Sequence, residues 1–181
     1  GIDIGILSRL PLAGTPVLNR IKFTHKPLPK TRGIMEVPLQ LPNGETLYVL
    51  GVHFPSQANP REQRVDAVNT LNEILAAKGN ARVIVGGDFN ITKEEDIEAK
   101  LFTGTLANNW QVSHLVGCKS CEGSHYFKGS WSFLDALLFS PSLDSNKGVD
   151  WRLDVDSIVT PTAGKYQMRN GVPSRFNEKY P

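Results

Sequence analysis

The sequence predicts a single strand-rich α/β domain, and three observations support this prediction. Apolar and β-branched runs of strand length recur along the chain. Only two segments combine a helix start signal with helical spacing or a capping pattern. The 181 residues are 40% hydrophobic and contain no internal repeat, linker or low-complexity segment, which is typical of one core. We therefore expect one domain over residues 1–181.

Four strands are predicted before the first helix. They cover residues 2–7, 17–23, 33–41 and 46–54. The third alternates apolar and polar residues, and Pro38 places it at a sheet edge or beside a bulge. Pro42-Asn43-Gly44 is typical of a hairpin turn and leads into the fourth strand. That strand is almost continuously apolar, so we expect it to be central and buried on both faces.

Two helices and four later strands follow. The first helix has Asn59 as its N-cap and Pro60 at its first position, and it ends at Gly79. Its apolar stripe consists of Val65, Val68, Leu71 and Leu75. The second begins with a capping box, Thr92 and Glu95, and runs to about Phe102. The later strands are residues 82–86, 111–116, 134–139 and 149–159, and the last twenty residues form polar coil.

The strand from Arg82 ends in Gly86-Gly87-Asp88-Phe89-Asn90, which is the strongest functional signal. In extended backbone Asp88 and Asn90 point the same way while Phe89 turns inward. The two glycines leave room for a ligand at this tip. A carboxylate beside a carboxamide suits a Mg²⁺-held phosphate and its attacking water. The alternative is an ordinary turn, in which Asp and Asn are common.

Two further polar residues lie at strand ends. His53 ends the fourth strand and is a candidate donor to a phosphate oxygen, although a hydrogen-bonded structural histidine is the common alternative. Asp135 begins an apolar strand, where a carboxylate needs a cation, an imidazole or N–H groups as a partner. We interpret Asp135 as an acid that orients a histidine, with a solvated strand end as the alternative.

Several basic and aromatic residues are candidates for substrate binding. Arg32 and Arg64 are suited to phosphate by their guanidinium geometry, while a solvated charge is the alternative for Arg64. Tyr126, Lys128 and Trp131 form a cluster that could stack a base or hold a phosphate, or serve only local packing.

The two cysteines leave three alternatives open. Cys118 and Cys121 form one CxxC motif, flanked by His114 and His125. Together these four residues resemble a zinc site. A disulfide is a second reading and would favour a secreted or periplasmic protein. Free thiols are the third.

Composition excludes few partners. The net charge of +2 includes no basic tail, yet a local basic cleft for nucleic acid remains compatible with it. No apolar run approaches the roughly 18 residues of a membrane span. The chain begins at Gly1 within a strand-like run, so we expect a processed or truncated piece.

The order of the motifs resembles the endonuclease/exonuclease/phosphatase superfamily, the deoxyribonuclease-I-like phosphoric ester hydrolases. From the N-terminus these motifs are GIDIGILSR, RGIMEVPL, GVHFPS, VGGDFN, GSWSFLDALLFSPSL and GVPSRF. The resemblance implies part of a four-layer α/β/β/α sandwich with mostly antiparallel or mixed sheets. It also implies a Mg²⁺- or Mn²⁺-dependent hydrolase, in which Asp88 positions or deprotonates the attacking water. Asn90 would hold the phosphate, His53 would contact it, and Asp135 would orient a catalytic histidine.

The chain also departs from the pattern of that superfamily. An upstream Asn, an upstream Glu that is the main metal ligand of the pattern, and a downstream Ser-Asp-His run are absent from this sequence. The resemblance implies Asp88 as a further candidate metal ligand beside that Glu. We therefore expect an incomplete and inactive fragment of a hydrolase, with a non-catalytic scaffold domain as the alternative. A nuclease is the favoured activity, although the motifs are shared by enzymes that cleave DNA, RNA, inositol phosphates or sphingomyelin. Oligomeric state is not predicted.

Overall fold

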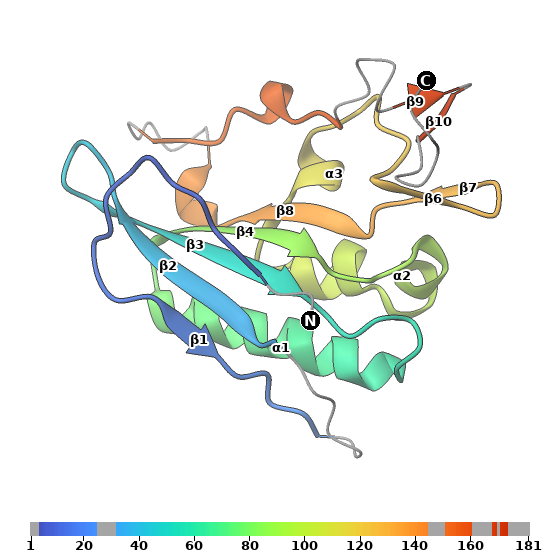
Figure 1. Cartoon of the computed structure of the whole chain (residues 1–181), viewed down its shortest axis with the longest axis horizontal. Coiled ribbons are helices and arrows are strands. Elements are labelled where there is room, and N and C mark those ends of the chain that lie inside the picture. Colours follow the sequence, from blue (N-terminus) through green and yellow to red (C-terminus); the bar gives the residue numbers. More distant parts are fainter. Residues whose placement is uncertain (1–3, 25–31, 145–150, 161–167, 170, 174–181) are drawn as a thin grey trace, which may run out of the picture.

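The computed structural model describes residues 4–24, 32–144, 151–160, 168, 169 and 171–173. Its centre is a six-stranded mixed sheet with the strand order β1-β2-β3-β4-β8-β5 (Figure 1). The strands are β1 (Val17–Asn19), β2 (Ile34–Gln40), β3 (Thr46–His53), β4 (Arg82–Asp88), β5 (Gln111–Val112) and β8 (Asp135–Phe139). Only β3 and β4 run parallel, and α1 connects them. The predicted α/β class with a mixed sheet is confirmed.

Helices and two small hairpins surround this sheet. The helices are α1 (Arg61–Lys78), α2 (Lys93–Ala99), the π-helix η1 (Leu101–Leu106), α3 (Ser113–Val116) and the 3-10 turns η2 (Pro141–Leu143) and η4 (Val155–Ser157). The hairpins pair β6 (His125–Phe127) with β7 (Ser130–Ser132), and β9 (Met168–Arg169) with β10 (Val172–Pro173). Within the described residues no helix is long and apolar enough to cross a membrane.

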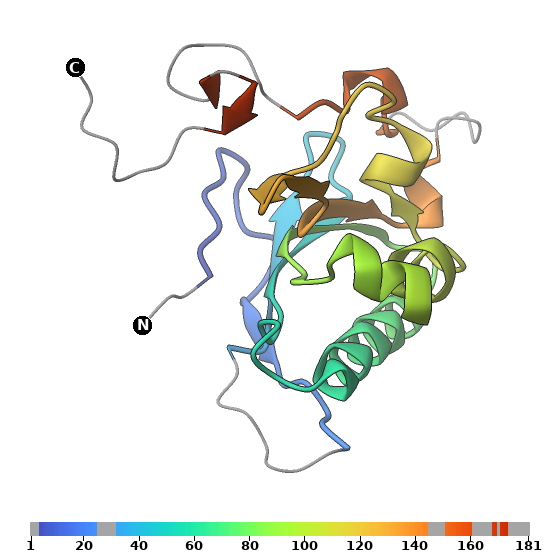
Figure 2. The same cartoon turned by 90° about the vertical axis from the view of Figure 1, so that its right-hand side faces the viewer.

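The two faces of the sheet are covered unequally. On one face, α1 and η1 pack over β3, β4 and β8, and fully buried Val68 and Leu71 join Val83 and Val85 in the main core (Figures 1 and 2). On the other face, the segment around η4 forms a smaller cluster with Phe139, Leu143 and Leu153. Leu137 of β8 is 44% exposed on this second face. The second face is therefore only partly covered.

The burial of β3 reflects the unequal covering of the two faces of the sheet. The predicted central position is confirmed, since β3 lies between β2 and β4. Burial on both faces is confirmed only from Leu50 to Val52, because the beginning of the strand is half-buried.

Four strand predictions were too long or wrong. The strand predicted at 17–23 ends at Asn19, and Ile4–Leu7 form no strand, while residues 1–3 lie outside the described residues. In the segment 111–116 the strand pairing stops after Val112. The Ser113 hydroxyl then accepts the Leu137 N–H at 3.1 Å, and α3 begins. In the described part of 149–159 there is no strand; Asp154 instead caps the turn η4 by accepting the Asp156 N–H.

The prediction that Pro38 marks a sheet edge was also wrong. Strand β2 lies between β1 and β3, and Pro38 is in register with Tyr48. The Pro38 carbonyl accepts from Ala13, so its missing N–H faces an irregular segment that has only a single bridge to β2. A proline is tolerated there because no ladder bond to β3 is lost.

The observed helix caps agree only in part with those predicted from the sequence. Helix α1 starts one residue later than predicted, with Pro60 as N-cap, because the Asn59 amide bonds to Ser56 instead. Its predicted stripe and its end at Gly79, which has φ 59°, are confirmed. Helix α2 begins as predicted, since the Thr92 hydroxyl accepts the Glu95 N–H at 3.2 Å. It ends at Ala99, before a left-handed Lys100 and the π-helix.

Candidate active site

Three of the predicted catalytic residues form one row across adjacent strands. In the sheet register His53 of β3 lies opposite Asp88 of β4, which lies opposite Asp135 of β8. His53 Nε2 is 3.8 Å from Asp88 Oδ2. The parallel β3 and β4 end at the same edge of the sheet, while the antiparallel β8 begins there. A histidine and two carboxylates are thus brought together from residues up to 82 positions apart.

His53 and Asp88 of this row line a hollow on the less covered face of the sheet. The hollow has a volume of about 420 Å³, and its lining includes His53, Asp88, Ile4, Gly51, Gly86 and Leu137. The side chains of His53 and Asp88 are 24% and 31% exposed. Both polar groups are therefore accessible to a ligand while their surroundings are largely apolar.

Electrostatics couple the two acids of the row. Partial loss of hydration raises the pKa of Asp135, and the neighbouring Asp88 carboxylate raises it further. A bond with the Ser124 hydroxyl and the charge of His125 oppose this shift. The row would gain stability from a cation or a protonated imidazole, because either would reduce the repulsion between the two carboxylates.

The tip after β4 differs from the extended backbone that we predicted. Phe89 is buried and packs edge-on against Phe54, as expected. Asn90, however, has φ 53°, and its N–H donates to Asp88 Oδ1 at 2.7 Å. Its side chain is not beside that of Asp88: Asn90 is 8% exposed and its Nδ2 donates to the Phe54 carbonyl at 3.0 Å. Asn90 therefore ties the ends of β3 and β4 together; its phosphate-holding role stays a prediction.

The two glycines of this tip, Gly86 and Gly87, have different structural roles. Gly86 lines the hollow, in agreement with the predicted bare surface. Gly87 has φ 141°, and a Cβ there would overlap the Val52 carbonyl oxygen. Gly87 is consequently required for the close approach of β3 to β4 rather than for ligand access.

Arg64 is not available as a phosphate contact, so that prediction was wrong. It is 2% exposed and its Nε lies 2.9–3.0 Å from both carboxylate oxygens of Glu95, which is 4% exposed. Its Nη1 donates to the carbonyls of Pro55 and Ser56. A buried guanidinium needs all these partners, and they lock the loop between β3 and α1 onto α2.

Glu95 and Gln57 are positioning residues that sequence reasoning missed. Gln57 Nε2 donates to Glu95 at 2.6 Å and to the Asn90 carbonyl at 2.5 Å. The network therefore reaches from Arg64 to the tip that carries Asp88. Glu95 was noticed as part of a capping box, yet its carboxylate bonds to Arg64 instead of returning to the cap.

The other predicted substrate contacts lie around the row. Arg32 is half-buried just before β2, and since Met35 pairs with Gly51, it lies at the edge where β3 ends. Lys128 is exposed at the tip of the β6–β7 hairpin, with its Nζ 5.3 Å from the Phe127 ring centre. Trp131 of the same hairpin packs against Tyr126 at 5.1 Å. Their contacts with substrate stay predictions.

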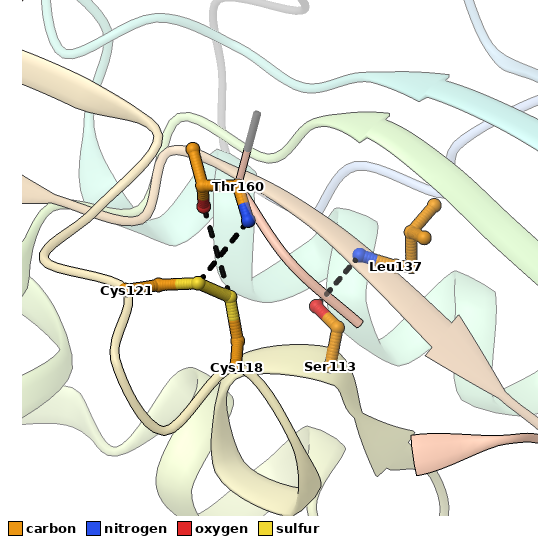
Figure 3. The surroundings of a disulfide bond; sticks show 5 residues. All are labelled: Ser113, Cys118, Cys121, Leu137 and Thr160. Carbon is orange, nitrogen blue, oxygen red and sulfur yellow. Dashed lines mark hydrogen bonds between the residues drawn. A yellow bond between two sulfur atoms is a disulfide. The ribbon is translucent and has the colours of Figure 1, made fainter. Parts of the chain in front are cut away.

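The cysteines form a disulfide, which makes the zinc reading wrong. Cys118 and Cys121 are bonded across a tight turn with a Cα–Cα distance of 5.2 Å. Figure 3 shows the bond against Thr160, whose N–H donates to Cys121 Sγ. The described residues contain no cluster of three side chains that could hold a metal. His114 lies instead between the rings of Phe102 and Phe133.

His114 should make stability depend on pH. Burial lowers its pKa from 6.5 to about 4, a shift only weakly opposed by Asp96. The unfolded chain therefore binds a proton that the folded chain rejects, so stability falls as the pH drops from about 6.5 towards 4. We expect the free energy of unfolding to fall by about 1–2 kcal/mol between pH 7 and pH 5 through this residue.

Urea titrations of the wild type and of His114→Phe at both pH values measure this effect. The variant keeps the stacked ring but cannot be protonated, so its stability should change less by the stated amount. An equal pH slope in the two proteins would contradict the assignment.

The described residues supply only part of the ligands that a Mg²⁺ ion needs. Mg²⁺ is commonly held by one or two carboxylates and completes its shell with water and substrate phosphate oxygens. Asp88 offers an accessible carboxylate at the hollow, and the raised pKa of Asp135 is consistent with a place where a cation is favourable. Asp88 is thus the described residue best placed to ligate the ion.

Comparison with solved structures identifies the fold. The chain is similar to an endonuclease/exonuclease/phosphatase from Beutenbergia cavernae, with a TM-score of 0.54, 15% identity and 74% of this chain covered. An endonuclease/exonuclease/phosphatase family protein from Leptotrichia buccalis has a TM-score of 0.53 with 14% identity over 76% of the chain. The human Nocturnin catalytic domain with bound sulfate has a TM-score of 0.51 with 18% identity over 74%.

The chain has the deoxyribonuclease-I-like fold. It covers 39%, 53% and 49% of these three structures, so it spans about half the length of the proteins that it matches. No protein-family model and no curated protein matches the sequence. The likeness to this fold therefore comes from the spatial arrangement of the strands and helices, and it agrees with the order of the motifs.

Proposed function

We propose that the protein is a metal-dependent hydrolase of phosphoric esters and that nucleic acid is its substrate. The observation that carries this proposal is the row of His53, Asp88 and Asp135 beside an accessible hollow, at the strand ends of a deoxyribonuclease-I-like fold. Ligand sites in α/β sheets gather at such strand ends.

The roles that we propose are compatible with the geometry of the row. Asp88 accepts a proton from, or orients, the attacking water, since its Oδ1 is engaged by the Asn90 N–H and its Oδ2 faces His53. His53 donates an imidazole N–H to a phosphate oxygen. Asp135 orients the imidazole of a catalytic histidine next to this row. A bound Mg²⁺ or Mn²⁺ would neutralise charge on the phosphate.

Hydrolysis assays of the full-length protein test this proposal. We expect Mg²⁺-dependent cleavage of DNA or RNA, abolished by EDTA and reduced about 100-fold in His53→Gln because a phosphate contact is lost. Inositol phosphates and sphingomyelin serve as competing substrates. Absence of metal-dependent hydrolysis of all four would favour the scaffold alternative.

The 181-residue chain alone is predicted to cleave plasmid DNA poorly, because the described site offers few carboxylates to hold the ion. Robust plasmid cleavage by this chain, lost in Asp88→Ala, would contradict that prediction. The Cys118–Cys121 disulfide supports a secreted or periplasmic location. Thiol titration of protein purified without reductant tests it, and two free thiols would argue against it.

A further inference from the structure

The disulfide lies within residues 113–124, a segment that is hydrogen-bonded to β8 at both of its ends. At one end the Ser113 hydroxyl accepts the Leu137 N–H, a bond that is drawn with the disulfide in Figure 3. At the other end the Ser124 hydroxyl accepts the Asp135 N–H at 2.9 Å. Because Asp135 belongs to the candidate catalytic row, a displacement of this segment would also act on that row.

The loop that carries the disulfide is closely packed on both sides. Gly117 precedes it, and a Cβ there would lie 2.6 Å from a backbone oxygen of η4. Gly123 follows it, and a Cβ there would lie 2.7 Å from the Ser132 carbonyl oxygen in β7. The Ser124 N–H donates to that same oxygen at 3.0 Å. A loop packed this closely transmits a change at its disulfide to Ser124, because the contacts leave little free space to absorb it.

The disulfide is accessible and closes only a short loop. Both cysteines are half-buried, and Lys119 and Ser120 between them are exposed, so a small thiol can reach the bond. A disulfide stabilises a fold less when the loop that it closes is short, so its reduction need not unfold the protein. Cys118 has φ 56°, a left-handed conformation that is unfavourable for a residue with a Cβ. Reduction removes the link to Cys121 and therefore allows this turn to relax.

We propose that the Cys118–Cys121 disulfide controls the candidate active site, and that its reduction by a dithiol lowers hydrolysis by releasing Ser124 from Asp135. The inference rests on the proposed function, since it concerns turnover at the same site. Ser124 is a positioning residue in this account. It acts on the reaction only through Asp135, which orients the imidazole of the catalytic histidine.

The redox step is a thiol–disulfide exchange. A thiolate of the dithiol attacks one sulfur of the bond, and the other cysteine leaves as a thiolate. The second thiol of the reductant then displaces the remaining cysteine from the mixed disulfide. The protein gains two electrons and two protons as cysteine thiols, while the dithiol is oxidised to a disulfide. Exchange with an oxidised dithiol restores the original bond.

Amide hydrogen exchange in the full-length protein, with dithiothreitol as the reductant, reports on Asp135 independently of activity. In the oxidised protein its N–H is protected by the bond to Ser124. After reduction we expect this N–H to exchange about 10-fold faster, as for one lost hydrogen bond. Turnover should fall about 10-fold with KM little changed, because Asp135 acts on the imidazole rather than on substrate binding. Buried Leu71 of α1 should keep its slow exchange, since the fold persists.

Matched variants separate the disulfide from other effects of dithiothreitol. Cys118→Ser combined with Cys121→Ser should reproduce the reduced protein and should no longer respond to the reductant. Ser124→Ala should accelerate exchange of the Asp135 N–H while the disulfide is intact, whereas Ser124→Thr keeps the hydroxyl and should preserve both readouts. Ser120→Ala is the control, because Ser120 is exposed in the same loop; it should respond to dithiothreitol as the wild type does.

Unchanged exchange and turnover on reduction would overturn the inference. Equally accelerated exchange of Leu71 would also overturn it, because the bond would then stabilise the whole fold instead of acting locally. If the Asp135 N–H responds to reduction while no phosphoric ester is hydrolysed, the coupling of the disulfide to Asp135 stands and the hydrolase proposal fails. If hydrolysis is equally fast with and without dithiothreitol, the hydrolase proposal stands and control by the disulfide is wrong.

Discussion

Replacing Asp88 by Asn should lower the turnover number of the full-length protein by roughly 10²–10⁴, because the proposed general base and metal ligand is lost. The fold should persist, since an Asn side chain can still accept the Asn90 N–H that Asp88 Oδ1 now accepts. Turnover is measured on the preferred nucleic acid, and the melting temperature reports the fold.

A matched control and a second readout sharpen this prediction. Asp156 is an exposed acid in η4, far along the chain from the row, so Asp156→Asn should keep full activity. In Asp88→Asn the pKa of Asp135 should also fall, because the Asp88 charge is one of the causes that raise it. An Asp88→Asn variant that retains more than about a tenth of wild-type turnover would remove Asp88 from the catalytic residues.

Replacing Arg64 by Met should lower the free energy of unfolding by about 3–5 kcal/mol, the usual cost of leaving a buried charge without its partner. Glu95 would remain 4% exposed with its main cation removed, and the carbonyls of Pro55 and Ser56 would lose a donor. Urea unfolding of the wild type and the variant measures the difference.

Two companion variants separate the buried charge from other causes. Lys22→Met removes a lysine whose side chain is 75% exposed and pairs with exposed Glu73, so it should cost less than about 1 kcal/mol. Arg64→Met combined with Glu95→Leu removes both buried charges and should recover part of the loss. If Arg64→Met costs no more than Lys22→Met, the ion pair does not stabilise the loop that follows His53.

Sequence reasoning succeeded where a local pattern has one physical meaning. The Thr92 cap, the end of α1 at Gly79 and the buried stripe on α1 each depend on neighbours within a few residues. The strand ends at His53 and Asp88 were also visible, because apolar runs stop there. It failed at residues 113–116, where the partner of Ser113 is the distant Leu137. It failed similarly for Arg64, since helical position does not reveal what lies across from a side chain.

The sequence by itself determined the class of the fold, the location of the strand-end residues and the motif order that resembles one superfamily. Local spacing and turn chemistry are sufficient for these properties. Only the tertiary structure decided that His53, Asp88 and Asp135 share one row, that Arg64 is buried, and that the cysteines are bonded to each other. The first two depend on sheet register and on contacts between residues far apart in the chain, which no local pattern encodes. The third depends on the geometry of one tight turn, which the CxxC spacing alone does not decide.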